Sequence, residues 1–173
     1  RRIIQTVTLS KAFGAYGGAI LGAAQLRRRI LDRSRMFAGS TPLPLPVANA
    51  ALAGVRILRA DRSLRRRLLA KAGYVKSALR EAGLALAEKP GPVVPVFPQR
   101  QSEFVRLRRA LLAAGIYPPF VKYPGGPASG YFRFVISSEH SRAQLDGLLR
   151  VLLAHSTTAA THGAKQARAV ETR

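Results

Sequence analysis

A lysine near the start of the chain lies between hydroxyl side chains and a glycine-rich stretch. Lys11 follows Thr8 and Ser10, and residues 14–18 come shortly after it. Loss of water around a lysine lowers the pKa of its ammonium group, which makes the amine a usable nucleophile toward a carbonyl. The two hydroxyls and the backbone N–H groups of residues 14–18 could hold an anionic group beside that amine. A covalently bound lysine next to a phosphate cradle is the arrangement that pyridoxal phosphate requires.

The same residues also have ordinary structural uses. Most lysines are solvated surface charges, and hydroxyls such as those of Thr8 and Ser10 often bond to neighbouring backbone groups. The local pattern alone therefore leaves a surface lysine as an open alternative.

An arginine within an apolar run is the second candidate for binding. Arg133 lies in the run 131–136, where strand alternation puts it on one face with Tyr131 and Val135. A guanidinium can hold a carboxylate through two parallel hydrogen bonds. A charge in such a strand needs a partner, which is either the carboxylate of a ligand or that of Glu139 in a structural ion pair.

The apolar pattern and the chain breakers predict the elements that position Lys11. Residues 3–9 predict a strand that leads to Lys11, and we expect no partner for this strand within the chain. A short strand at 17–21 and a helix at 23–33 follow. Three prolines at alternating positions within residues 37–46 predict an extended loop before a helix at 47–59.

The rest of the chain predicts a mixed arrangement of helices and strands around Arg133. Pro95 predicts an edge position or a bulge for the strand that contains it. A hairpin-like connection is expected between the last two strands. The predicted order is helix 61–83, strand 93–97, helix 102–114, strand 116–123, strand 131–137 and helix 141–154.

Together these elements predict an α/β protein, namely the end of a large α/β domain followed by a small C-terminal α+β domain. We assign residues 1–60 to the large domain and residues 61–154 to the small one. Small polar and charged residues dominate residues 155–173, so we expect a disordered tail there.

The composition excludes cysteine-based sites and leaves the role of the positive charge open. The chain has no cysteine, which excludes disulfides and thiolate metal sites, and no cluster of ligands indicates a metal. The net charge is +21, mostly from arginine clusters such as residues 27–29 and 65–67. Solvated helix faces explain these clusters most simply. The alternative is a basic nucleic-acid-binding module, although aromatic residues do not interleave with the arginines.

No apolar run is long and uninterrupted enough to predict a membrane span, and no signal peptide is visible. We therefore expect a cytoplasmic location.

The surroundings of Lys11 resemble a family signature. The run from Thr8 to Gly18 reads as the motif T-L-S-K-A-F-G-x-x-G-G of the α-oxoamine synthases. This group includes glycine C-acetyltransferase and 8-amino-7-oxononanoate synthase, and it is close to the class II aminotransferases. Further segments resemble the family in the same order, over about residues 3–153: 37–42, 91–96, 115–116, 123–124 and 132–140. The resemblance implies the fold-type I architecture of pyridoxal-phosphate-dependent transferases.

The resemblance implies roles for the residues near the cofactor. Lys11 matches the lysine that forms an imine with pyridoxal phosphate and later moves a proton at the substrate Cα. Thr8 matches a hydroxyl that binds the cofactor phosphate, and Ser10 is a neighbouring candidate. Ser40 and Thr41 belong to a loop that reaches the phosphate from the neighbouring subunit, although Gly39 and Leu43 depart from the family pattern in this loop.

On the substrate side, Arg133 matches the arginine that binds the α-carboxylate of the amino acid. Ser129 roughly matches a hydroxyl near the substrate. His140 matches a recurrent histidine, to which we assign a structural role at the start of the last helix.

The activity that the resemblance implies is condensation of an amino acid with an acyl-coenzyme A in a homodimer whose active site lies at the subunit interface. The positive charge would suit the phosphates of coenzyme A. An aminotransferase or a lyase on the same fold is the alternative. The family's ring-stacking histidine and pyridine-binding aspartate have no counterpart here, so we expect a C-terminal fragment that binds the cofactor poorly and is inactive alone.

Overall fold

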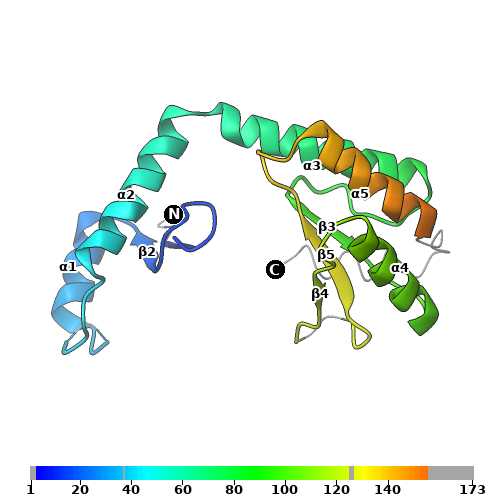
Figure 1. Ribbon diagram of the computed structural model, residues 1–173. Coiled ribbons are helices and arrows are strands. Elements are labelled where there is room, and N and C mark those ends of the chain that lie inside the picture. Colours follow the sequence, from blue (N-terminus) through cyan, green and yellow to red (C-terminus); the bar gives the residue numbers. More distant parts are fainter. Residues whose placement is uncertain (1–2, 37, 125–126, 156–173) are drawn as a thin grey trace. The chain divides into compact units, whose positions relative to one another are not determined.

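The computed structural model describes residues 3–36, 38–124 and 127–155 (Figure 1). The chain divides into two compact units, Arg1–Arg62 and Ser63–Arg173. The tail predicted for residues 155–173 lies outside the described residues except for His155, which ends the last helix.

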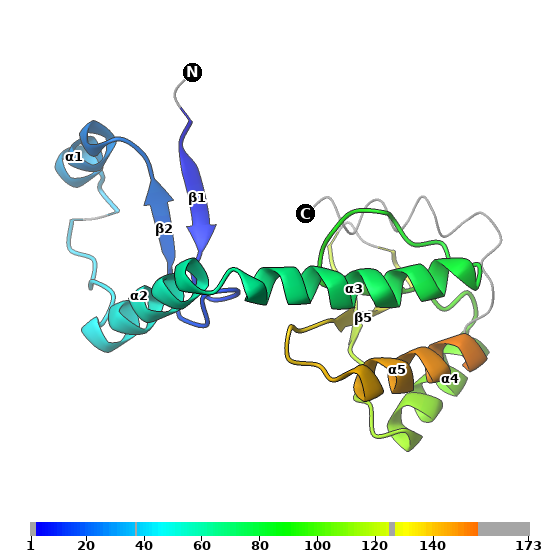
Figure 2. The ribbon, with the colours of Figure 1, turned by 90° about the horizontal axis from the view of Figure 1, so that it is seen from above.

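In the part of the first unit that the structure describes, the chain forms a two-stranded sheet and two helices. Strand β1, Gln5–Thr8, pairs antiparallel with β2, Gly18–Leu21, in the register Gln5↔Leu21 to Thr8↔Gly18 (Figure 2). Helices α1, Ala24–Arg33, and α2, Leu45–Ala60, follow. The prediction that the first strand has no partner in the chain is therefore wrong, because the glycine-rich loop turns the chain back onto β1.

Helix α2 begins directly after the proline-rich loop, with proline at its first turn as predicted. Proline suits this position because the N–H groups of the first turn have no partner within the helix. Only Ala51 of α2 is buried, and no residue of α1 is. The first unit therefore has little apolar core of its own among its described residues.

Among its described residues, the second unit has three helices and a three-stranded sheet. The helices are α3, Ser63–Glu81, α4, Gln101–Ala113, and α5, Arg142–His155. The strands are β3, Val93–Val96, β4, Phe120–Val121, and β5, Tyr131–Val135, in the antiparallel order β3-β5-β4. The edge position of the strand that contains Pro95 and the hairpin between the last two strands are both as predicted.

The core of the second unit lies between one face of this sheet and the three helices. Strand residues Val94 and Val96 pair with Phe134 and Phe132, so these four side chains share a face. Leucines of all three helices are buried in the same cluster: Leu79, Leu107, Leu111, Leu145, Leu148, Leu149 and Leu152. The opposite face of β5 carries Arg133.

The strand predicted at residues 116–123 is much shorter in the structure, which assigns only Phe120 and Val121 to β4. Two consecutive prolines, Pro118 and Pro119, precede these residues. Proline has no N–H to donate to a sheet, so it ends the ladder there.

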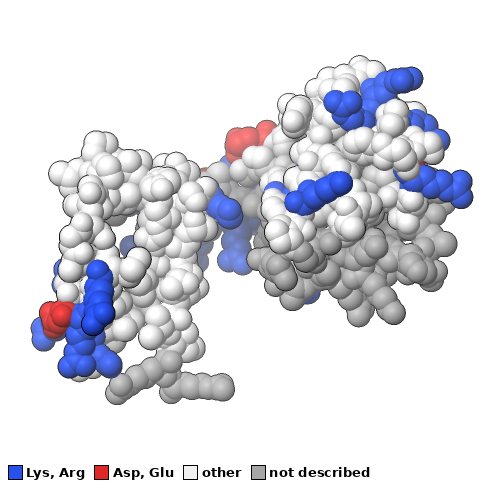
Figure 3. All heavy atoms as spheres, turned by 90° about the horizontal axis from the view of Figure 1, so that it is seen from below, with Lys and Arg blue, Asp and Glu red and all other residues white. Residues whose placement is uncertain are grey.

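None of the described helices is both long enough and apolar enough to cross a membrane. Lysine and arginine far outnumber acidic residues on the face drawn in Figure 3.

Candidate active site

Lys11 lies in a tight turn that follows β1. The N–H of Gly14 donates to the carbonyl of Lys11 at 3.0 Å, and the N–H of Ala15 donates to the carbonyl of Leu9 at 3.0 Å. Gly14 has a φ of 61°, a conformation that favours glycine. The N–H of Gly14 is thus used within the turn, which differs from the expected role of this group in an anion cradle.

The Lys11 side chain is exposed within the chain. The described residues therefore do not supply the loss of water that would activate its amine. A ligand or another protein surface would have to supply it.

Two hydroxyls lie together just before Lys11. Thr8 Oγ1 and Ser10 Oγ are 2.8 Å apart, and the N–H of Ser10 donates to Thr8 Oγ1 at 3.3 Å. Both residues are exposed. The three residues predicted nearest the cofactor are thus exposed neighbours in the chain: Thr8 ends β1, Ser10 and Lys11 follow it, and the two hydroxyls are in contact.

The loop that carries Lys11 packs against later parts of the first unit. A Cβ at Gly17 would contact the side chain of Leu43, with its Cδ1 at 3.5 Å. A Cβ at Gly54, in α2, would be only 2.4 Å from the carbonyl oxygen of Phe13. The sequence did not predict either contact. For the contact between Gly54 and Phe13, the one available signal was a glycine in the middle of an alanine-rich helix.

The second pair of predicted phosphate ligands lies in the proline-rich segment. Ser40 and Thr41 are exposed, and Ser40 Oγ donates to the carbonyl of Met36. Within the chain this hydroxyl closes a local turn. No described contact joins Ser40 or Thr41 to Lys11.

Arg133 lies in β5 with its backbone held on both sides. It pairs with Pro95 of β3, and its N–H donates to the carbonyl of Pro119 at 2.8 Å. Its side chain is half-buried and has no hydrogen bond or ion pair with the described residues. Burial raises the pKa of the Tyr131 hydroxyl, and the charge of Arg133 partly offsets this effect. The guanidinium is therefore positioned by the sheet and is available to an anion.

The structural alternative for Arg133 was an ion pair with Glu139. In the structure Glu139 instead contacts Arg67 of α3, with 3.5 Å between Nη2 and Oε1. Hydrogen bonds from Ser138 and Arg67 lower the pKa of the Glu139 carboxyl. This carboxylate therefore has another partner.

His140 has the structural role that was assigned to it. Its Nδ1 accepts a hydrogen bond from the N–H of Ser137 at 3.0 Å in the turn before α5. The helix itself begins with reciprocal bonds between Ser141 and Gln144, which satisfy N–H groups at its first turn.

Ser129 is exposed in the connection between β4 and β5, next to Gly130. Gly130 has a φ of 76°, and a Cβ there would be 2.6 Å from the ring of Phe120. The connection is thus fixed directly before the strand of Arg133. Lys11 and Arg133 belong to different units.

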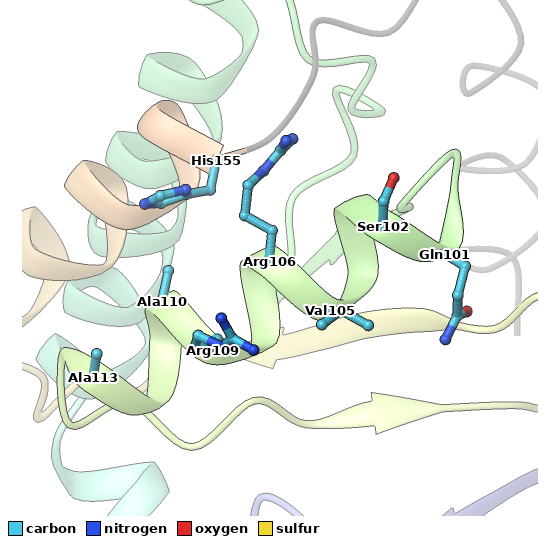
Figure 4. Close-up of a pocket in the computed structure, with 8 residues that line it drawn as sticks. All are labelled: Gln101, Ser102, Val105, Arg106, Arg109, Ala110, Ala113 and His155. Atoms are coloured by element: carbon cyan, nitrogen blue, oxygen red, sulfur yellow. The ribbon is translucent and has the colours of Figure 1, made fainter.

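A hollow on the outer side of α4 is a second surface feature of the same unit. Arg106 and Ser102 project on the side of α4 that faces His155, at the end of α5 (Figure 4). None of the predicted site residues lines this hollow, and among its lining residues no nucleophile is paired with a base.

Comparisons with known proteins identify the class of this chain. The family model described as aminotransferase class I and II matches residues 2–152, and the chain belongs to this family. Within the family, the resemblance to α-oxoamine synthases is confirmed by the particular relatives that match.

Two curated relatives are 8-amino-7-oxononanoate synthases. The protein of Anaeromyxobacter dehalogenans (strain 2CP-C) is 32% identical over 146 residues, which cover 84% of this chain and 37% of the relative. The protein of Xylella fastidiosa (strain M12) is 32% identical over 162 residues, which cover 93% of this chain and 40% of the relative. The chain thus spans about two fifths of the length of these relatives.

Solved structures give the same result for the fold. A serine palmitoyltransferase of S. paucimobilis with a bound PLP–myriocin aldimine has a TM-score of 0.76 at 25% identity, over 88% of this chain and 39% of that one. An 8-amino-7-oxononanoate synthase of Francisella tularensis has a TM-score of 0.74 at 21% identity, over 88% and 45%. The predicted fold-type I architecture is confirmed.

Proposed function

We propose that the protein containing this chain is a pyridoxal-phosphate-dependent acyltransferase that condenses an amino acid with an acyl-coenzyme A. The observation that carries the proposal is the turn that holds Lys11, which directly follows the paired hydroxyls of Thr8 and Ser10 in the chain. The names of the relatives, 8-amino-7-oxononanoate synthase and serine palmitoyltransferase, support this reaction class.

The described residues fit pyridoxal phosphate. A primary amine can bond to its aldehyde carbon, and the two hydroxyls, 2.8 Å from each other, can donate to phosphate oxygens. The cofactor, when bound, withdraws electrons from the substrate Cα, so that a bond to this carbon breaks more easily.

Each predicted residue has a task in this proposal. Lys11 holds the cofactor and then moves the proton at Cα. Arg133 orients the substrate carboxylate through two parallel hydrogen bonds. Ser129 is a further hydroxyl on the connection that leads into β5.

The proposed role of Ser40 and Thr41 depends on a dimer. Their segment would reach the cofactor phosphate of a second subunit, which makes a homodimer part of the proposed function. A cytoplasmic location and the assignment of residues 1–60 to the cofactor-binding domain also remain predictions, as does our expectation that these residues alone are inactive.

The test is release of free thiol from an acyl-coenzyme A, in the presence of amino acids, by the intact protein that carries this sequence. Lys11→Ala should reduce the rate by several orders of magnitude, because the variant has no amine for the cofactor or for the proton. Arg108→Lys, an exposed change on α4, is the control and should leave the rate unchanged. Thiol release that persists in Lys11→Ala would contradict the proposal.

Two alternatives give different results in the same experiments. An aminotransferase converts an amino acid to its oxo acid without consuming acyl-coenzyme A. The net charge of +21 is also compatible with a nucleic-acid-binding module. Such a module would bind nucleic acid in a salt-dependent manner, and the binding would survive Lys11→Ala.

A further inference from the structure

Helix α2 contains a glycine where a helix does not favour one. Gly54 lies well inside Leu45–Ala60, among several alanines. A glycine in a helix interior is less favourable than alanine because it loses more backbone freedom on folding. A close contact with a neighbouring backbone is one reason for a glycine at such a position.

The packing reason is the backbone of Phe13. A Cβ at Gly54 would lie 2.4 Å from the Phe13 carbonyl oxygen, 3.2 Å from its carbonyl carbon and 3.3 Å from its Cα. All three atoms belong to the main chain and cannot rotate away as the end of a side chain can. Helix α2 and the loop thus approach each other at a distance that only glycine permits.

Phe13 is part of the turn that holds Lys11. It precedes Gly14, whose N–H closes the turn on the Lys11 carbonyl at 3.0 Å. A displacement of the Phe13 carbonyl therefore moves the peptide unit that joins Phe13 to Gly14, and with it the turn. The contact at Gly54 fixes the position of this turn on α2.

We propose that Gly54 is a positioning residue for Lys11, which sets where the lysine amine meets the cofactor by seating the Phe13 carbonyl on α2. This inference rests on the proposed function for its chemical consequence. Its structural part, the position of the turn, can be measured without any cofactor.

The central variant is Gly54→Ala, which adds a single methyl group at the contact. Gly73→Ala is the matched control, because Gly73 lies inside α3 and a Cβ there would have no atom within 4 Å. Ala53→Gly is a second control, since it weakens α2 at an exposed neighbouring position without adding any atom.

The first measurement is amide hydrogen exchange of Gly14 and Ala15, whose N–H groups donate within the turn. Gly54→Ala should accelerate their exchange roughly tenfold, because overpacking against the backbone forces the turn to open or shift. Gly73→Ala should leave it unchanged, and Ala53→Gly should affect α2 amides more than those of the turn.

The second measurement is covalent trapping of pyridoxal phosphate on Lys11 of the intact protein by borohydride, followed by peptide mass analysis. Gly54→Ala should lower the trapped fraction severalfold and shift the pH at which the imine forms, whereas both controls should match the parent protein.

Unchanged exchange at Gly14 and Ala15 in Gly54→Ala would overturn the inference, as would equal effects of Gly54→Ala and Ala53→Gly. Loss of all α2 structure in Gly54→Ala would also overturn it, since the glycine would then serve the helix as a whole. Absence of trapping in the parent protein contradicts the proposed function instead, and leaves the exchange result to decide the structural part.

Discussion

At the scale of single residues, the two main candidates for the active site, Lys11 and Arg133, differ in exposure and in how the backbone holds them. Lys11 is exposed on a turn, whereas Arg133 is half-buried in a strand whose neighbours hold its backbone. The position of the Lys11 amine therefore depends on contacts from beyond the turn itself. For Arg133, the strand already fixes the place from which the guanidinium extends.

Arg133→Lys should weaken binding of the amino-acid substrate, because lysine cannot form the two parallel hydrogen bonds of a guanidinium. We expect a rise in KM for the amino acid of roughly tenfold or more, since hydrogen bonds to charged groups contribute about 1.5–3 kcal/mol. Steady-state kinetics of the intact protein measure this change. A KM equal to that of the parent protein would exclude Arg133 from substrate binding.

The motif around Lys11 was readable from the sequence because its residues are adjacent, and so was the alternation that places Arg133 on one face of its strand. Gly54 was not, because its reason is a contact with Phe13, which lies 41 residues earlier in the chain. No local pattern reports a contact of that kind.

At the scale of elements, polar contacts tie α5 to α3. The hydroxyl of Tyr74 donates to Asp146 Oδ1 at 2.6 Å, and Arg142 Nε donates to the same carboxylate at 3.0 Å. The Arg142 guanidinium also lies 3.7 Å from the centre of the Tyr74 ring. The hydrogen bonds from Tyr74 and then Arg142 lower the pKa of the Asp146 carboxyl from 3.8.

A carboxyl with a lowered pKa in the folded state stabilises that state while it is ionised. The contribution of Asp146 is therefore present above its ordinary pKa of 3.8 and is lost as the pH falls through the lowered value. Asp146→Asn should lower the melting temperature at neutral pH, and the difference should shrink well below pH 3.8.

Melting curves across this pH range test the effect, with Asp32→Asn in α1 as a control that leaves the contact with Tyr74 intact. A difference between Asp146→Asn and the parent protein that is constant with pH would show that ionisation of Asp146 is not involved.

The predictions at this scale were correct for the edge position of β3 and wrong for the length of β4 and for the pairing of β1. Pro95 indicated an edge strand, and β3 is one. The β4 strand is short because Pro118 and Pro119 cannot extend the ladder, which the apolar pattern alone concealed. The pairing of β1 with β2 was missed, since partners of a strand depend on how the loop between them turns.

At the scale of the whole molecule, the two units differ in how much apolar surface they bury. The core cluster lies entirely in the second unit, whereas the first unit exposes large apolar side chains such as Ile4, Ile20 and Ile57. Burial of apolar surface is the main source of stability. The units should therefore differ in resistance to opening.

Hydrogen exchange over the whole chain should show amides of α3, β5 and α5 protected at least about tenfold more than those of β1, β2 and α1. Peptide-level mass spectrometry can measure this difference. Equal protection in the two units would mean that another protein surface covers the first unit. Repeating the exchange measurement at several protein concentrations would show whether a second copy of the chain provides that surface.

Pro95 has a consequence for association between molecules. It lies in β3, which has β5 as a neighbour on one side only among the described strands. The free edge of such a strand is a template on which a foreign strand can add and start an aggregate. Proline offers no N–H at this point of the edge, so a strand that docks there cannot form a continuous ladder, and the sheet that supports Arg133 resists growth from its β3 edge.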